Sequence, residues 1–349
     1  MKALRLEQFN EMAVVELPDP DLPGPGEVRI TVAVTGICGT DIHGFTGENG
    51  RRVPGQVMGH ETAGVVDALG EGVAGLSVGD QVTFNPVLVP EVEAEEYAGR
   101  EQRAPGRRVV GVAPEIVAAF AQYVTVPARN VVPLPADLPI ELGALIEPLA
   151  VAVHAVRQAQ VQAGDRVLVV GGGPIGQSVV LALQATGAGS VVVTEPTAGR
   201  RELVQELGVT ALEPSGADAD IARIHSALGG AADVAIDAVG ISATLATALH
   251  ATRLDGRVCL VGMGTPSLTL DAFLVSTGER QIVGSFAYSA DDFRTAAAWI
   301  AADPDRARSL ISRTIPLTAA PTAFTELAAH ADVPGKVLVS LAVDPTEES

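Results

Sequence analysis

The chain has 349 residues, of which 47% are hydrophobic, and its formal net charge is -19 at pH 7. This length allows two domains with buried cores, and the acidic balance argues against nucleic-acid binding, which needs clustered lysine and arginine. Residues 1–12 lack the continuous apolar stretch of a signal peptide, so we expect a cytoplasmic protein. With only Cys38 and Cys259 present, we expect no disulfide framework.

The first 135 residues contain short β-branched segments that are separated by glycine and proline. Such segments predict strands, and the turn sequences at 17–26 and 69–80 prevent the neighbouring strands from continuing. We therefore expect a β-rich, barrel-like domain. The predicted strands are residues 28–35, 62–68, 81–84 and 123–126.

From Glu147 the pattern changes to strands that alternate with helices, which predicts a parallel sheet. The predicted helices are 147–160, 174–186, 200–207 and 242–254, and the predicted strands are 166–170, 190–194, 232–237, 257–261 and 281–286. After residue 290 we expect one more helix and a final strand, 336–343, that returns to the first domain. The expected domains are therefore residues 1–152 together with 288–349, and residues 153–287.

A glycine-rich turn lies directly between the predicted strand 166–170 and the helix that follows it. In such a Gly-x-Gly-x-x-Gly turn, the first glycine allows the tight turn, the second lets the backbone approach a pyrophosphate, and the third allows close packing of helix on strand. The sequence therefore predicts a dinucleotide site formed by Gly171, Gly173, Pro174, Ile175 and Gly176.

An acidic residue, Glu195, ends the next predicted strand. At this distance from the glycine-rich turn, a carboxylate can accept hydrogen bonds from the ribose hydroxyls of the adenosine and would repel a 2'-phosphate. We therefore expect NAD as the cofactor, with Arg200 also at the site. Because Arg200 and Arg201 lie close by in the sequence, NADP remains the alternative.

Candidate metal ligands occur in three short segments, which contain Cys38, the pair His60 and Glu61, and Glu147. Thiolate, imidazole and carboxylate together suit a catalytic zinc, in which three protein groups leave a fourth position for water or substrate. Such an ion lowers the pKa of a bound hydroxyl toward about 7. In an extended backbone, neighbouring side chains point to opposite faces, which disfavours His60 and Glu61 as joint ligands. Glu61 and Glu147 therefore remain alternative ligands.

Three motifs stand in one order ahead of the glycine-rich turn: Gly-Ile-Cys38-Gly-Thr-Asp, Gly-His60-Glu61 and Glu147-Pro-Leu-Ala-Val. In this order they resemble the zinc-dependent medium-chain dehydrogenases, most closely the polyol and diol branch with sorbitol, threonine and butanediol dehydrogenases. The resemblance covers nearly the whole chain. It implies an α/β protein with a GroES-like β-barrel catalytic domain and a Rossmann domain with a doubly wound parallel sheet. It also implies hydride transfer between a small secondary alcohol and NAD, and a homotetramer or homodimer.

The resemblance also assigns roles to individual residues. Cys38 and His60 would bind a catalytic zinc, with Glu61 or Glu147 completing the set of ligands. Thr40 would take the alcohol proton and pass it through the nicotinamide ribose to His43 and solvent. Asp41 is expected to be structural.

The sequence departs from this family in the segment that matches residues 84–110. Many relatives hold a second, structural zinc there with four closely spaced cysteines, and this chain has none in that segment. We therefore expect one catalytic zinc per subunit and no structural zinc.

A second departure concerns the substrate. Sorbitol dehydrogenases place tyrosine directly after the relay histidine and Phe-Arg-Tyr after the last strand of the nucleotide domain, where this chain has Gly44 and Phe286-Ala-Tyr288. Without these polar side chains, sorbitol itself is in doubt as the substrate. The candidate substrates are then a shorter diol, a cyclitol or an unusual sugar alcohol. The expected pocket walls are Phe45, Phe286 and Tyr288.

Two other functions are alternatives. A zinc-free quinone or enoyl reductase of the same superfamily would use NADPH, but it would have no need of Cys38, His60 and Glu147. A nucleotide-binding protein without turnover would have no need of Thr40 and His43.

Overall fold

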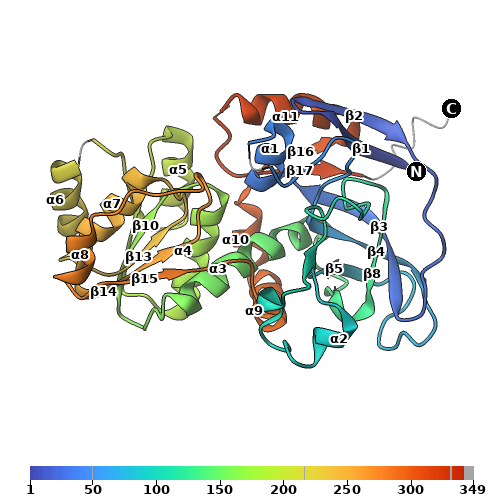
Figure 1. Cartoon of the computed structure of the whole chain (residues 1–349), viewed down its shortest axis with the longest axis horizontal. Coiled ribbons are helices and arrows are strands. Elements are labelled where there is room, and N and C mark those ends of the chain that lie inside the picture. Colours follow the sequence, from blue (N-terminus) through green and yellow to red (C-terminus); the bar gives the residue numbers. More distant parts are fainter. Residues whose placement is uncertain (49, 216, 331, 342–349) are drawn as a thin grey trace. The chain divides into compact units, whose positions relative to one another are not determined.

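The computed structural model describes residues 1–48, 50–215, 217–330 and 332–341. The chain forms two compact units, one of Met1–Glu147 with Ser289–Ser349 and the other of Pro148–Tyr288 (Figure 1). The second unit is thus inserted between two parts of the first. In the described residues, no helix combines the length and apolar character that crossing a membrane would need.

The first unit is built on a mostly antiparallel sheet in which seven of the described strands take part, in the order β16-β17-β3-β4-β5-β9, with β8 also paired to β3. The pairs β1–β2 and β6–β7 lie outside this sheet. Its strands are β1 (Lys2–Gln8), β2 (Glu11–Glu16), β3 (Glu27–Gly36), β4 (Glu61–Leu69), β5 (Gln81–Phe84), β6 (Val87–Leu88), β7 (Arg108–Val109), β8 (Tyr123–Pro127), β9 (Val131–Pro133), β16 (Ile311–Pro316) and β17 (Lys336–Ser340).

Short helices complete the first unit. They are α1 (Gly39–Thr46), α2 (Glu91–Ala94), α9 (Ala290–Ala302), α10 (Pro304–Arg308) and α11 (Ala320–Ala328), with the 3-10 helices η1 (Glu101–Arg103), η2 (Ala128–Asn130), η3 (Ile140–Leu145) and η4 (Leu317–Ala319). Phe324 of α11 contacts the rings of Phe45 and Phe120, with ring centroids 5.7 and 5.6 Å away. These aromatic rings belong to the buried core of this unit, so α1 and α11 are packed together.

The second unit is a parallel sheet of six described strands, in the order β12-β11-β10-β13-β14-β15. In chain order this is 3-2-1-4-5-6, the order of a Rossmann fold, whose ligands bind at the carboxyl ends of the strands. The strands are β10 (Arg166–Val170), β11 (Ser190–Thr194), β12 (Thr210–Leu212), β13 (Ala232–Asp237), β14 (Thr252–Leu260) and β15 (Gln281–Gly284). Its helices are α3 (Ile146–Gln158), α4 (Pro174–Thr186), α5 (Ala198–Glu206), α6 (Ala217–Leu228), α7 (Ser242–Ala251) and α8 (Ala272–Ser276).

The strands predicted from the sequence are present, and the α/β class with a parallel sheet is confirmed. The helix predicted to reach residue 254 ends at Ala251, because Thr252 turns into extended backbone and its hydroxyl donates back to the Ala248 carbonyl oxygen at 2.6 Å. The tail also differs from the prediction. Its described part contains the α-helices α9, α10 and α11 and the 3-10 helix η4, and the strand β16 lies between α10 and η4.

The final strand β17 pairs with β3, so the tail returns to the first unit. Its last expected residues, 342 and 343, lie outside the described part of the chain. The division into units falls after Glu147 and after Tyr288, whereas the expected boundaries followed residues 152 and 287.

Candidate metal and nucleotide sites

The pairing of β3 with β4 brings two of the candidate ligand segments together. These strands are antiparallel, and Gly36 at the end of β3 lies opposite Glu61 at the start of β4. Cys38 therefore follows β3 at the same edge of the sheet where His60 precedes β4. A Cβ atom at Gly36 would lie 2.3 Å from a carboxylate oxygen of Glu61, so only glycine leaves room for this carboxylate.

Three of the four predicted metal ligands converge. One ligand atom each from Cys38, His60 and Glu61 lie within 4.8 Å of one another, the one such group found among the described residues. His60 and Glu61 are both buried. The alternation of side chains in an extended backbone, which disfavoured His60 and Glu61 as joint ligands, does not separate them here, because His60 lies before β4 and follows Gly59, whose φ is +100°.

Glu147 lies outside this group of three, at the first turn of α3, where its carboxylate is buried. Its charge nevertheless contributes to raising the pKa of His60 and of Lys336, so it acts on the same site. Of the two alternative carboxylates, Glu61 is thus the one gathered with the thiol and the imidazole.

The buried ammonium of Lys336, at the start of β17, contacts Glu61. Its Nζ lies 2.7 Å from the Glu61 carboxylate and 3.4 Å from the Ile37 carbonyl oxygen. Burial by itself would lower the pKa of Lys336, but the charges of Glu61 and Cys38 outweigh burial and raise it. Lys336 is therefore held as a cation that balances the Glu61 carboxylate. In the sequence it was visible only as the first residue of a predicted strand.

Asp41 is also part of this site. It is fully buried, its Oδ2 accepts a hydrogen bond from the Cys38 backbone N–H at 3.1 Å, and its Oδ1 lies 3.6 Å from Nδ1 of His60. Burial acts to lower the pKa of His60, yet the charges of Asp41 and Cys38 raise it to about 10. Asp41 caps α1, which agrees with the expected structural role. Its position beside His60 was not predicted from the sequence.

The two predicted relay residues lie on α1. The Thr40 hydroxyl donates a hydrogen bond to Cys38 Sγ at 3.3 Å, which places it next to the ligand group. His43 follows one helical turn later on the same face. Its side chain is partly exposed, and its Nδ1 lies 3.0 Å from Oε2 of the exposed Glu48.

The three expected pocket walls do not behave alike. Phe45 is buried in the core of the first unit against Phe324, which argues against its lining a substrate pocket. Its position in α1 turns it inward, away from the polar face that carries Thr40 and His43. Tyr288 is also fully buried, which argues against a wall, and Phe286 alone is exposed.

The glycine-rich turn in the second unit has the geometry that its sequence predicts. Gly171 has a φ of +98°, and a Cβ atom at Gly176 would lie 1.9 Å from the Gly171 carbonyl oxygen. Gly173 is the N-cap of α4, with Pro174 in its first turn, followed by Ile175. The turn therefore leaves the amino end of a 13-residue helix open to an anionic group at the carboxyl end of β10.

Glu195 directly follows β11 and is held against this turn. Its Oε2 accepts a hydrogen bond from the Gly172 N–H at 2.7 Å, and its Oε1 accepts one from the Thr197 N–H at 2.8 Å. Arg201 is engaged by the Glu195 and Pro196 carbonyl oxygens and by the Glu213 carboxylate. Arg200 lies nearer the turn, with its Nη1 3.7 Å from where a Cβ atom of Gly173 would be.

The segment that matches the structural-zinc lobe of relatives is held by other contacts. The Glu93 carboxylate accepts a hydrogen bond from the Gly106 N–H at 3.0 Å, and Glu101 accepts one from the Ala290 N–H at 3.0 Å. Arg129 pairs with Glu91. Carboxylates and a guanidinium thus tie this lobe to its surroundings.

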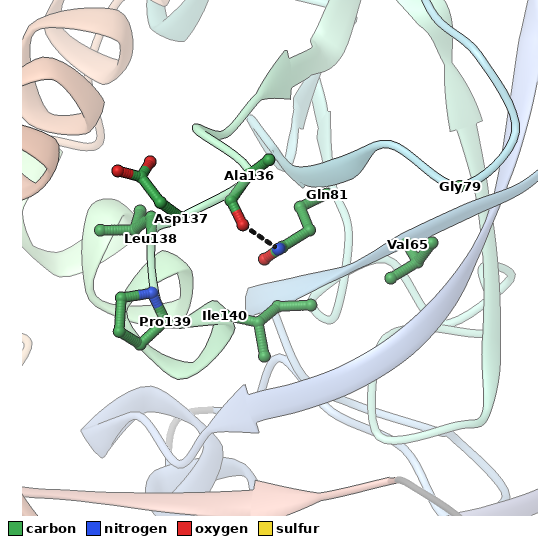
Figure 2. A pocket seen from close by; sticks show the side chains of 8 residues that line it. All are labelled: Val65, Gly79, Gln81, Ala136, Asp137, Leu138, Pro139 and Ile140. Carbon is green, nitrogen blue, oxygen red and sulfur yellow. Dashed lines mark hydrogen bonds between the residues drawn. The ribbon is translucent and has the colours of Figure 1, made fainter.

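A surface cavity of about 540 Å³ lies elsewhere on the first unit (Figure 2). Among its lining residues, the Gln81 side-chain amide donates a hydrogen bond to the Ala136 carbonyl oxygen at 3.0 Å (Figure 2). No predicted site residue lines this cavity, so it is separate from the metal site. Its lining residues are Val65, Gly79, Gln81, Ala136, Asp137, Leu138, Pro139 and Ile140.

Comparison with known proteins gives two family matches. Residues 24–136 match the alcohol dehydrogenase GroES-like domain, and residues 174–302 match the zinc-binding dehydrogenase family. Together they cover more than half of the chain, and they confirm the expected pairing of a GroES-like domain with a Rossmann domain.

Individual proteins agree with these matches. The 2-dehydro-3-deoxy-L-galactonate 5-dehydrogenase of Pseudoalteromonas atlantica is 35% identical over 87% of this chain and 89% of its own length. The D-xylulose reductase A of Aspergillus niger is 32% identical over 93% of this chain and 92% of its own. The crystal structure of 2R,3R-butanediol dehydrogenase from Bacillus subtilis has a TM-score of 0.87 at 29% identity, covering 98% of this chain and 99% of that one. This chain therefore belongs to the zinc-dependent medium-chain alcohol dehydrogenases and, within them, to the polyol branch.

Proposed function

We propose that the protein uses one zinc ion and NAD to oxidise a secondary alcohol of a small diol, polyol, sugar alcohol or cyclitol to the ketone. The observation that supports this best is the convergence of Cys38, His60 and Glu61 beside the hydroxyl of Thr40. The second unit supplies a glycine-rich turn and Glu195, which suit a dinucleotide.

The donor set fits zinc. Sulfur, nitrogen and carboxylate oxygen are the atoms that zinc prefers, and the three ligand atoms already lie within 4.8 Å of one another, so a small inward shift of these side chains would bring them to zinc bond lengths of about 2.0–2.3 Å. Cys38, His60 and Glu61 would hold the ion, and Glu147 would add negative charge nearby. The bound ion supplies a Lewis acid that lowers the pKa of a substrate hydroxyl. Lys336 pairs with Glu61, so a zinc ion held by this carboxylate would share it with the ammonium.

Two residues of α1, Thr40 and His43, would transfer the proton that the alcohol loses. Thr40 lies at hydrogen-bond distance from the Cys38 sulfur, so its hydroxyl is placed to receive a proton from an alcohol held at the metal site. His43 is partly exposed and is placed to release that proton to solvent. A carboxylate at its Nδ1, from Glu48, favours the proton on that nitrogen and leaves the other ring nitrogen as the acceptor.

NAD is the proposed cofactor because of charge at the end of β11. The buried Glu195 is fixed by two backbone N–H groups, so its carboxylate stays beside the turn, where it can accept ribose hydroxyls and repel a 2'-phosphate. Arg201 is already engaged by three oxygens, which leaves it poorly placed to bind a phosphate.

A small polyhydroxylated substrate is supported by the relatives, which include a xylulose reductase and a butanediol dehydrogenase. Long polyols are disfavoured because Gly44 and Ala287 stand where sorbitol dehydrogenases carry polar side chains. The exposed Phe286 is the remaining candidate for an apolar wall.

Two further proposals concern the environment of the protein. A homodimer or homotetramer is supported by the exposed Phe273 and Leu270, which lie close in sequence to β15, an edge strand of the parallel sheet. A cytoplasmic location is supported by the free thiols of Cys38 and Cys259, because disulfides persist mainly in oxidising compartments.

The activity is tested by following NADH absorbance with a panel of small diols, sugar alcohols and cyclitols, each with NAD and with NADP. We expect reduction of NAD by at least one secondary alcohol, loss of activity with a zinc chelator, and recovery when zinc is returned. Chelator-insensitive oxidation of NADPH by quinones would contradict the proposal.

Zinc binding is expected to release protons, because a pKa of about 10 keeps His60 protonated in the metal-free site at neutral pH and zinc binds the neutral ring. Zinc affinity should therefore rise with pH, by about tenfold per pH unit for each proton released. Titration calorimetry in buffers of different ionisation enthalpy measures this. We expect one zinc per chain, abolished by Cys38→Ala and unchanged in a Glu95→Gln control; two tightly bound ions would contradict it.

Replacing the relay histidine should change the pH profile. His43→Ala is expected to lower kcat by about tenfold or more at low pH, where few other proton acceptors are available, and less at high pH. Imidazole-type buffers should restore part of the loss. The exposed His250 on α7 provides the control variant His250→Ala. A His43→Ala profile that matches the wild type would remove His43 from the proton path.

Cofactor choice should depend on the charge of Glu195. Glu195→Gln keeps the size of the side chain and removes its charge, so the ratio of kcat/KM for NADP to that for NAD should rise by at least tenfold, which corresponds to about 1.4 kcal/mol. Glu213→Gln, which alters only an exposed partner of Arg201, is the control. An unchanged ratio in Glu195→Gln would assign the selection to other residues.

A further inference from the structure

The space beside Gly44 is taken by another side chain. A Cβ atom at Gly44 would lie 2.3 Å from Cγ of Arg52, and 3.3 Å from both Cβ of Arg52 and Sδ of Met58. Gly44 lies inside α1 with ordinary helical backbone, so its lack of a side chain serves to admit Arg52 and not to form a turn. The position where sorbitol dehydrogenases carry tyrosine is thus filled by an arginine from the segment before β4.

Arg52 is a buried cation whose nearest anion is Asp41. Its side chain is 1% exposed, that of Asp41 is 0% exposed, and its Nη2 lies 3.6 Å from Asp41 Oδ1. Buried charges are very unfavourable unless an opposite charge accompanies them. Asp41 therefore compensates Arg52, and its removal would leave the guanidinium without the one anion that lies within 4 Å of it among the described residues.

Asp41 connects both ligand segments of the metal site. One of its oxygens accepts the Cys38 backbone N–H at 3.1 Å, and the other lies 3.6 Å from His60 Nδ1. A histidine that binds a metal through one ring nitrogen carries its proton on the other, and a carboxylate at that nitrogen fixes the orientation of the ring. A displacement of Asp41 would therefore change the positions of both Cys38 and His60.

Several polar atoms of this cluster have no hydrogen-bond partner within the described part of the chain. They are Asp41 Oδ1, Arg52 Nε and Nη2, and His60 Nδ1. Buried polar atoms are rarely left without partners, and here Nη2 and Nδ1 lie at the same distance of 3.6 Å from the same oxygen. The cluster is thus arranged around Asp41 Oδ1, with Arg52 on one side and His60 on the other.

We propose that Arg52 is a positioning residue of the metal site, which holds Asp41 and through it fixes Cys38 and His60. The site then has two buried ion pairs, because the Lys336 ammonium lies 2.7 Å from Glu61 and the Arg52 guanidinium lies 3.6 Å from Asp41. The missing side chain of Gly44 leaves the space that Arg52 occupies. This inference rests on the proposed zinc site.

The first test compares Arg52→Met, which removes the charge at similar length, with Arg52→Lys, which keeps it. Zinc affinity is measured by competition with a chelating dye, and the geometry of the site by the visible spectrum of the cobalt-substituted protein. We expect zinc affinity to fall by about 10- to 100-fold in Arg52→Met, with a changed cobalt spectrum, and to recover in part in Arg52→Lys. Wild-type affinity and spectrum in Arg52→Met would overturn the inference.

A second test uses the contact between Gly44 and Arg52. Gly44→Ala should lower zinc affinity in the wild-type background, because its methyl group displaces Arg52. In an Arg52→Ala background the same change should have no further effect, since the space is then free and alanine favours a helix. Gly39→Ala in the same helix is the control, because a Cβ atom there meets nothing within 4 Å. Additive effects of Gly44→Ala and Arg52→Ala would overturn the inference.

Different results would contradict the proposed zinc-dependent function and the role of Arg52. If the wild-type protein binds no zinc, and its cobalt form lacks a thiolate band that depends on Cys38, the proposed function fails and this inference fails with it. If the wild type binds one zinc that depends on Cys38, but both Arg52 variants and Gly44→Ala leave affinity and spectrum unchanged, only the role of Arg52 is refuted.

Discussion

The metal site depends on one strand pairing, that of β3 with β4 at the register that sets Gly36 opposite Glu61. This register places the residues after β3 and before β4 at one edge of the sheet, so Cys38 and His60 meet although the chain between them forms a helix and a loop. A one-residue slip would send every side chain of a strand to the other face. The absent side chain of Gly36 then lets the Glu61 carboxylate lie among the ligands.

Burial makes charge balance the second constraint on this site. Asp41, Glu61 and Glu147 are buried around a thiol, and that concentration of negative charge suits a divalent cation. Lys336 offsets part of it from β17, and it contacts the same carboxylate that the metal would need. The Lys336 ammonium thus reduces the repulsion between negative charges in the metal-free site. A metal ion that binds Glu61 then has to compete with this ammonium.

Much of the architecture could be predicted because local sequence and tertiary structure agree. The strands β10, β11 and β13 are apolar segments bounded by turns. At Gly171 and Gly176 a Cβ atom would clash with neighbouring atoms, and the spacing of the glycine motif already predicts this close packing. The strands β1, β2, β6, β7, β9, β12 and β16 were not predicted. In β16 the two isoleucines are separated by exposed Ser312, Arg313 and Thr314, so the sequence lacks the alternation typical of a strand, and the place of β16 depends on pairing with β17.

The ligand types could be predicted at the metal site, but their surroundings could not. Arg52 and Lys336 carry no motif, and their burial follows from how β4 and β17 are set against β3. Phe45 was predicted as a pocket wall because it is an aromatic residue near a catalytic motif, whereas its place on α1 turns it toward Phe324. The direction of a side chain within a short helix was the missing information.

The insertion of the second unit between the two parts of the first has a consequence for biosynthesis. A ribosome releases residues 148–288 before it releases β16, α11 and β17, so the nucleotide-binding unit can fold while the sheet of the first unit still lacks its last strands. Lys336 emerges with β17, after residues 148–288. Until then the Glu61 carboxylate has no Lys336 ammonium to balance its charge.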